Sequence, residues 1–188
     1  MEVVAVAARD ELWPIALGQY GFITTVDARE AGVAPNELAK LASRNRLAHV
    51  GHGLYRFPEL PETGRDDYMR AVLAVGEPNA LLSHDTALAV HELCDINPDT
   101  VHVTIPRASR VRRTLPGITI HRDNLEATDR DWWEGIPVVT PATAIGQGIQ
   151  AGVPHQLLTQ AIRTARRNHF IDAKQTRRLR AMLRERAA

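Results

Sequence analysis

Residues 25–57 read TVDAREAGVAPNELAKLASRNRLAHVGHGLYRF, and the spacing of their apolar and turn-forming residues predicts the local fold. Thr25 is suited to cap a short helix over residues 26–31, which Gly32 ends. Pro35 suits the first position of a second helix. Three apolar side chains of that helix fall at i, i+3 and i+4 and predict one buried face: Leu38, Leu41 and Ala42.

A hairpin is predicted after these two helices. Residues 47–50 and 54–57 are short apolar runs on either side of a Gly-His-Gly turn, as in a β-hairpin. Upstream, Asp10 is suited to cap a further helix. Three helices followed by a hairpin are typical of a winged helix-turn-helix, which we expect to occupy residues 1–58.

The helix that starts at Pro35 has an outward face rich in hydrogen-bond donors. In winged-helix proteins such a helix contacts base edges, and neighbouring side chains hold phosphates. We predict that the DNA-binding residues are Asn36, Lys40, Ser43 and Arg44 of this helix, Arg46 after it and His52 at the hairpin turn. Residues 1–58 carry no net charge, however, and the same fold also serves in protein interactions. Protein binding therefore stays open as an alternative to DNA binding.

The composition excludes several classes of protein. The chain has 188 residues, of which 44% are hydrophobic and 24% charged, which suits one large or two small domains. Its single cysteine, Cys94, permits no internal disulfide. No stretch approaches the roughly 20 apolar residues of a membrane span, and the first residues do not resemble an export signal. We therefore expect a cytoplasmic protein that starts at its true N-terminus and has no membrane partner.

The composition of the sequence changes after the predicted hairpin. Residues 59–65 have the proline, glycine and acid content of a linker, so we expect a second domain over residues 66–188. Helices are predicted there over 66–75, 83–93, 141–149, 154–168 and 172–186, and strands over 101–105, 118–121 and 135–140. The expected fold class is α+β, with an N-terminal winged helix-turn-helix followed by a mixed α/β C-terminal domain ending in basic helices.

Charge is distributed unevenly along the chain. Residues 59–159 carry eight basic and fourteen acidic side chains, whereas residues 160–188 carry nine basic and two acidic ones. The last segment therefore favours an acidic partner, either nucleic acid or protein. Because its helices have apolar stripes that would pack inward, we expect its arginines to point away from the domain.

Two sets of arginines are candidate partner- or phosphate-binding residues, because guanidinium groups bind phosphates and carboxylates bidentately. They are Arg107, Arg110, Arg112 and Arg113 between two predicted strands, and Arg163, Arg166, Arg167, Arg177 and Arg178 in the last two helices. For the first set, a solvated loop that keeps a sheet edge soluble is an equal alternative. For the second set, a partner surface is favoured.

Catalytic and metal sites are not predicted. His84, His91 and Cys94 lie roughly on one face of a predicted helix, but a fourth zinc ligand is not evident, so we interpret them as partly buried helix residues. The sequence has no nucleophile elbow, phosphate loop or protein-kinase signature. Trp132-Trp133 is interpreted as a core anchor with a polar rim. We therefore expect no enzyme activity, no metal and no cofactor.

Several short motifs occur here in the order in which they occur in one protein family. They are GFITT (21–25), AGV (31–33), GHGLYR (51–56), LSHDTALA (82–89), VHVTIP (101–106), HR (121–122) and GIPVVTPA (135–142). Through them, roughly residues 10–150 resemble the AbiEi-type antitoxins of type IV toxin–antitoxin systems, bacterial proteins often involved in phage defence. The chain departs from the family pattern at Thr143 and Gln147, where the family has an arginine and an aspartate.

The resemblance implies an antitoxin that acts in two ways. Its winged helix would bind inverted repeats in its own promoter and repress the operon, and its C-terminal domain would oppose a nucleotidyltransferase-like toxin. Two alternatives are kept. For some mycobacterial relatives a protein-kinase activity towards the toxin has been proposed, and a stand-alone regulator would share the DNA site without the toxin.

Overall fold

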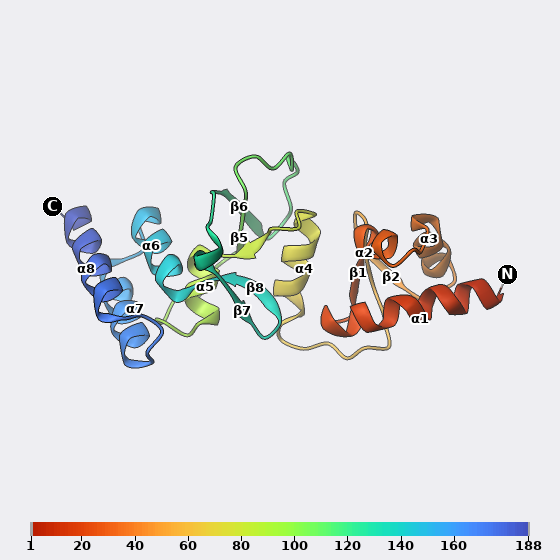
Figure 1. The fold of residues 1–188 in the computed structure, drawn as a ribbon, viewed down its shortest axis with the longest axis horizontal. Coiled ribbons are helices and arrows are strands. Elements are labelled where there is room, and N and C mark those ends of the chain that lie inside the picture. Colours follow the sequence, from red (N-terminus) through yellow and green to blue (C-terminus); the bar gives the residue numbers. More distant parts are fainter. Residues whose placement is uncertain (1, 188) are drawn as a thin grey trace. The chain divides into compact units, whose positions relative to one another are not determined.

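The computed structural model describes residues 2–187, which form two compact units (Figure 1). The chain divides between Gly76 and Glu77, so that unit 1 is Met1–Gly76 and unit 2 is Glu77–Ala188. Helix α4 (Asp66–Val75) belongs to unit 1, whereas the linker predicted at residues 59–65 would assign it to the second domain. Each unit combines helices with a β-sheet, so the predicted α+β class is confirmed.

Unit 1 contains three helices and a small sheet before α4. Its elements are α1 (Glu2–Gly18), β1 (Phe22–Thr24), α2 (Thr25–Glu30), α3 (Pro35–Ser43), β2 (Ala48–Gly51), β3 (Leu54–Arg56) and α4. The strand order is β1-β3-β2, and both outer strands run antiparallel to β3. The two helices and the hairpin predicted from residues 25–57 are therefore present.

Three details of unit 1 differ from the prediction. Helix α1 starts at Glu2 rather than after Asp10. The N-terminal cap of α2 is Thr24 rather than Thr25: Thr24 Oγ1 accepts a bond from the Asp27 N–H at 3.1 Å, and Asp27 Oδ2 accepts one from the Thr24 N–H at 2.7 Å. Strand β1 is absent from the prediction because three residues are too few to show a period of two.

The core of unit 1 lies among α1, α2, α3 and the sheet. Its most buried side chains are Leu12, Ala16, Ile23, Ala28, Leu38, Leu41, Leu47 and Phe57. Arg9 of α1 lies over the rings of Trp13 and Phe57, with its guanidinium carbon 5.1 Å and 5.3 Å from their centroids. Arg9 also pairs with Glu59 at 2.8 Å, so α1 is held to the segment that follows the hairpin.

Unit 2 is built around a five-stranded mixed sheet. Its elements are β4 (Leu81–Leu82), α5 (His84–Val90), β5 (Val101–Ile105), β6 (Ile118–Arg122), a 3₁₀ turn (Ala127–Asp129), β7 (Arg130–Trp133), β8 (Ile136–Val139), α6 (Pro141–Ala151), α7 (His155–Arg167) and α8 (Ala173–Ala187). The strand order is β6-β5-β4-β8-β7. The pairs β5–β6 and β4–β8 are parallel, and the pairs β4–β5 and β7–β8 are antiparallel.

Helix α6 contains glycines in its interior, and one of them has a packing role. A Cβ on Gly148 would lie 3.1 Å from Leu158 Cδ2 of α7 and 3.2 Å from Leu88 Cδ1 of α5, closer than ordinary contact. The absent side chain therefore permits the close approach of α5, α6 and α7. Thr140 caps α6, and Pro141 occupies its first turn as predicted.

Two short strands of unit 2 were not predicted, and one of them overturns the interpretation of the tryptophan pair. Strand β7 forms an edge of the sheet, and the Trp132 side chain is 70% exposed. Trp132 is therefore not a core anchor. The prediction failed because Arg130 and Asp131 hide the strand pattern, and an edge strand leaves one face in water.

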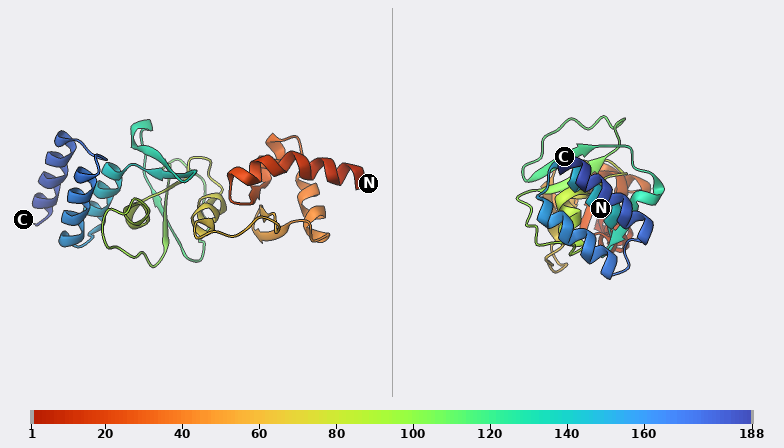
Figure 2. Two further views of the ribbon diagram at one scale, coloured as in Figure 1. Left: turned by 90° about the horizontal axis from the view of Figure 1, so that it is seen from below. Right: turned by 90° about the vertical axis from the view of Figure 1, so that its left-hand side faces the viewer.

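Helices α7 and α8 lie side by side (Figure 2). Their bounds agree with the predicted helices to within one residue at each end. Leu158, Ala161, Ile162, Leu179 and Leu183 form their buried stripes. Among residues 2–187, every helix is too short or too polar to cross a membrane.

Candidate nucleic-acid interface

Helix α3 buries one face and leaves the predicted DNA-facing residues in solvent. Leu38 and Leu41 are almost completely buried in the core of unit 1. The residues on the other side are exposed: Asn36, Lys40, Ser43 and Arg44. They are brought together because Asn36, Lys40 and Ser43 or Arg44 follow one another at intervals of three or four residues, about one helical turn. Arg44 is the C-terminal cap residue, so it lies just beyond the last turn.

Two of these side chains already make local contacts. Lys40 Nζ lies 2.6 Å from Glu37 Oε1, and Ser43 Oγ donates a hydrogen bond to the Lys40 carbonyl at 2.9 Å. The Lys40 side chain is exposed, and an ion pair between residues one helical turn apart contributes little to stability, so Lys40 can exchange Glu37 for a phosphate. Asn36 and Arg44 are exposed as well, which gives α3 both amide and guanidinium donors.

The hairpin presents His52 at an exposed turn beside α2. The Thr25 N–H donates to the Gly53 carbonyl at 2.9 Å, which ties the turn to the first residue of α2. Gly53 has a φ of +65°, and a Cβ built on it would lie 3.0 Å from Thr25 Oγ1. A residue without a side chain is therefore required there. Arg46 is exposed between α3 and β2, where the sequence predicts a flanking contact.

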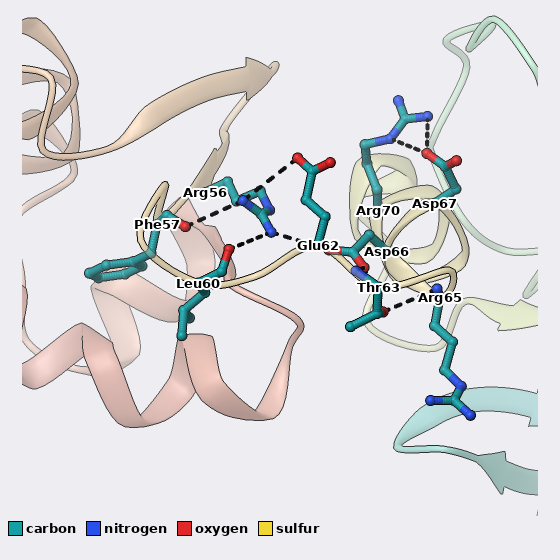
Figure 3. A network of polar contacts seen from close by, with 9 residues as sticks. All are labelled: Arg56, Phe57, Leu60, Glu62, Thr63, Arg65, Asp66, Asp67 and Arg70. Carbon is teal, nitrogen blue, oxygen red and sulfur yellow. Dashed lines mark hydrogen bonds and ion pairs between the residues drawn. The ribbon is translucent and has the colours of Figure 1, made fainter.

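A buried arginine supports the end of the hairpin. Arg56 of β3 donates to the Leu60 carbonyl at 2.9 Å and pairs with Asp66 of α4 at 3.3 Å (Figure 3). Burial opposes ionisation of Asp66, but hydrogen bonds from Thr63 and the charge of Arg56 lower the pKa of this carboxyl below its usual value. Arg56 was not predicted as a structural residue, because its partners lie up to ten positions away in an apparently loose segment.

The arginines between β5 and β6 lie in a loop that is partly held by internal bonds. Arg107 pairs with Asp123 at 3.0 Å, so its charge is compensated within unit 2. Arg122 of β6 donates to the carbonyls of Ser109, at 2.9 Å, and Val111, and so holds the loop backbone. Arg110 and Arg112 are exposed, whereas Arg113 is partly buried. The loop therefore does not present the four predicted arginines as equivalent groups.

The arginines of α7 and α8 also fall into two kinds. The exposed residues Arg163, Arg167, Arg177 and Arg178 project from the two helices. Arg163, Arg180 and Arg184 line a hollow of about 270 Å³ between α7 and α8, together with His155, Thr159, Ile162 and Leu183.

Two arginines of this region are exposed but also bond to backbone carbonyls of the same unit, so they are not wholly free for a partner. Arg186 donates to the carbonyls of Ile149 and Val153 at 3.2 Å and 2.8 Å, at the C-terminal end of α6. Arg166 donates to the Ile171 carbonyl at 3.5 Å. A guanidinium at a helix C-terminus satisfies carbonyls that have no partner within the helix, which explains the position of Arg186.

The structure also changes the interpretation of the histidines. Helix α5 ends at Val90, so His91 and Cys94 do not share a helical face with His84. The His91 Nε2 lies 2.8 Å from the Val139 carbonyl, and burial lowers the pKa of this imidazole. Burial also raises the pKa of the Cys94 thiol to about 11. The set considered from the sequence is therefore not a metal site.

A different histidine set comes together: His84 at the start of α5, His102 on β5 and His121 on β6. His102 Nδ1 lies 3.0 Å from His121 Nε2, and the His84 ring stacks on the His121 ring with centroids 3.5 Å apart. Burial, followed by the charges of His121 and His102, lowers the pKa of His84 to about 3. Burial likewise lowers the pKa values of His102 and His121. Each ring is therefore harder to protonate than a free imidazole.

His84 is also strained, since its φ of +50° is unusual for a residue with a Cβ. Such a backbone conformation costs about 1–3 kcal/mol and is often found at functional sites. Gln147 stabilises it, because Gln147 Oε1 accepts a hydrogen bond from the His84 N–H at 3.0 Å. Gln147 thus has a structural role at a position where the chain departs from the family pattern. Thr143, the other departure, donates to Asp129 Oδ1 at 2.8 Å.

Comparison with known proteins supports a regulator-like first unit. Residues 14–58 match a family model described as a transcriptional regulator, AbiEi antitoxin. No curated protein matches the chain. Among solved structures, the crystal structure of the RV2827C protein from Mycobacterium tuberculosis is similar, with a TM-score of 0.56 and 18% identity over 95% of this chain and 75% of that chain.

The structural similarity concerns the fold alone, because the identity is low. The family match is more specific, since it spans α2, α3 and the hairpin and so contains each of the predicted DNA-facing residues. The motifs that suggested the family from the sequence lie partly in this same segment. Over residues 14–58, this chain thus matches the AbiEi antitoxin family of transcriptional regulators.

Proposed function

We propose that this protein is an antitoxin that represses its own operon, with unit 1 as a winged helix-turn-helix. In this proposal α3 enters the major groove, the hairpin is the wing, and Arg46 and His52 contact flanking phosphates. The observation that carries it is the exposed donor face of α3 within the segment matched by the regulator family. The operator is an inverted repeat in the protein's own promoter.

Electrostatics support a site on α3 despite the neutral first segment. Lys40, Arg44 and Arg46 lie within seven residues and are all exposed. The acidic side chain nearest to them in the helix, Glu37, is occupied by Lys40. A duplex that approached this face would therefore meet cationic and amide donors, which suits phosphate and base contacts.

Binding to a promoter fragment tests the DNA-binding part of the proposal. Lys40→Ala with Arg44→Ala should abolish specific binding and leave the thermal unfolding midpoint nearly unchanged, because both side chains are exposed. Arg70→Ala with Lys174→Ala removes the same charge from other helices and is the matched control. Wild-type affinity should fall with rising salt as phosphate contacts release counterions. Full operator affinity in the α3 double variant contradicts the assignment.

We further propose that unit 2 neutralises a nucleotidyltransferase-like toxin by recognition and not by catalysis. The exposed arginines of α7 and α8 and the hollow between these helices support a surface for an acidic partner. Co-expression with the adjacent gene, scored for rescue of growth, tests neutralisation. Purified protein should transfer no phosphate to the toxin from any nucleoside triphosphate. Stoichiometric phosphorylation that one substitution in unit 2 abolishes would establish the kinase alternative.

A further inference from the structure

Three imidazole side chains from separate elements of unit 2 converge on one point. His84 comes from the start of α5, His102 from β5 and His121 from β6, and one nitrogen of each lies within 4.8 Å of those of the other two. The parallel register explains the convergence: Thr104 pairs with His121, so His102 and His121 lie on neighbouring strands two positions apart in register. Side chains with this offset project from the same face of the sheet.

We propose that His84, His102 and His121 bind a divalent transition-metal ion, with Zn²⁺ as the preferred ion. Three histidines with one open position form a known kind of zinc site, and imidazole suits zinc better than magnesium or calcium. At Zn–N distances of about 2.0–2.1 Å, tetrahedral ligands lie about 3.3 Å apart. His102 Nδ1 and His121 Nε2 are 3.0 Å apart, already close to that separation.

The rings must rotate before they can coordinate an ion. The His84 and His121 rings are stacked with an interplanar angle of 14°, so their lone pairs do not yet point at a common centre. All three side chains are only partly buried, which leaves room for rotation about χ2. Metal binding would replace ring stacking and the His102–His121 hydrogen bond with three metal–nitrogen bonds.

The surrounding residues orient His84 in the way that metal ligands are oriented. Ser83 Oγ lies 3.0 Å from His84 Nδ1 and also accepts a hydrogen bond from Thr104 Oγ1 at 2.8 Å. With Nδ1 held by a hydroxyl, Nε2 of His84 is the nitrogen available to a metal. Ser83 and Thr104 are almost completely buried, although a sheet beneath a helix is usually apolar. These two buried hydroxyls hold each other and the His84 ring in place.

The negative charges around the histidines also suit a bound cation. Asp85 and Asp123 both interact electrostatically with the cluster, and together they would compensate a dication that neutral histidines cannot.

Metal titration of the full-length protein tests the proposal independently of DNA or toxin binding. Tag-free protein is stripped with a chelator, dialysed and titrated with Zn²⁺ by calorimetry, and with Co²⁺ by visible absorption. We expect one ion per chain and the intense bands of four-coordinate Co²⁺. His102→Gln and His121→Gln should each weaken Zn²⁺ binding by more than about 100-fold, because even outer-shell changes weaken metal sites by about 10- to 100-fold. His155→Gln, an exposed histidine of α7, should bind as the wild type does.

Thermal unfolding separates loss of the site from loss of the fold. Zn²⁺ should raise the unfolding midpoint of the wild type and of His155→Gln, since an ion that binds only the native state stabilises it. It should not raise the midpoint of His102→Gln or His121→Gln. The proposal is overturned if the wild type binds no stoichiometric ion, or if Zn²⁺ acts equally on the wild type and the cluster variants. In either case the three rings are a neutral hydrogen-bonded cluster and not a metal site.

Discussion

Arg56 Nη2 lies 3.3 Å from Asp66 Oδ1, so the last residue of β3 is bonded to the first residue of α4 across a segment whose sequence resembles a linker (Figure 3). The guanidinium also lies 5.8 Å from the centre of the Phe22 ring on β1. Arg56 is 8% exposed, which is unusual for an arginine. One side chain thus joins the sheet, the following loop and α4 within unit 1.

Removal of Arg56 is expected to destabilise unit 1. Arg56→Ala should lower the free energy of unfolding by about 3 kcal/mol, because it leaves the mostly buried carboxylate of Asp66 without a counter-charge, held only by hydrogen bonds from Thr63. Arg70→Ala removes an exposed pair with Asp67 and should lower it by less than about 1 kcal/mol. Urea unfolding can be followed by the fluorescence of Trp13, in a chain with Trp132→Phe and Trp133→Phe. Equal losses in the two arginine variants would contradict the structural role of Arg56.

The hairpin turn supplies a second prediction. Gly53→Ala should lower the unfolding free energy of unit 1 by about 1–2 kcal/mol, because it places a Cβ at a left-handed φ and 3.0 Å from Thr25 Oγ1. Gly51→Ala is the matched control in the same hairpin, since its Cβ would meet only Leu54 Cβ at 3.8 Å. The same urea titration compares them. If Gly51→Ala is the more damaging of the two, the turn geometry described here is wrong.

The parts of the fold that could be predicted are those with a repeating pattern. Leu38 and Leu41 identify the buried face of α3, and the same spacing leaves Lys40 and Arg44 in solvent. Strands β5 and β6 follow from alternation over five residues each. Strands β1, β4 and β7 have between two and four residues, too few to show a period of two, whereas the equally short β2 and β3 are predicted from the Gly-His-Gly turn between them.

The histidine cluster and the Arg56 network could not be predicted, because each depends on which segments meet. The sequence shows that His102 and His121 alternate with apolar residues in their strands. It does not show that these two strands pair, or in which register. His84 joins them only because α5 starts above that face. A search along one helix instead groups His84 with His91, whose ring is bonded to the Val139 carbonyl. The spacing of residues within one helix or strand can be seen in a sequence, whereas contacts between different helices and strands cannot.

His91 makes the stability of unit 2 depend on pH. Burial lowers its pKa below the ordinary value of 6.5, so between these two values the unfolded chain binds more protons than the folded one. The stabilisation is complete above pH 6.5 and is lost as the pH falls towards the lowered pKa, with a slope of up to about 1.4 kcal/mol per pH unit. His91→Gln should reduce this slope.

Urea titrations of the chelator-treated protein between pH 4 and pH 7.5 measure the effect of His91. A slope in His91→Gln equal to that of the wild type would show that this ring does not gain a proton on unfolding. Thermal melts at the same pH values give an independent check on the direction of the change.

The last two helices allow partner binding to be separated from packing. Ile171, Leu179 and Leu183 are buried, so deleting α8 would expose the interior of unit 2 and could not test its arginines alone. Arg180→Ala with Arg184→Ala changes two side chains that line the hollow between α7 and α8. We expect this double variant to fail in rescuing cells from the toxin, because a protein partner concentrates its binding energy in a few arginines. Its unfolding free energy should stay within about 0.5 kcal/mol per substitution of the wild type.

Arg186 is the matched control for this pair, because it belongs to the same helix but bonds the carbonyls of Ile149 and Val153. Arg186→Ala should lower the unfolding free energy by about 1–2 kcal/mol, since it removes charge-assisted hydrogen bonds at the end of α6. At a temperature where the variant remains folded, it should still neutralise the toxin.

The affinity for operator DNA, measured in parallel, distinguishes the two possible acidic partners, which are DNA and the toxin. The Arg180→Ala/Arg184→Ala double variant could still rescue growth but bind operator DNA weakly. In that case the hollow is a second DNA contact, and its assignment to the toxin is wrong.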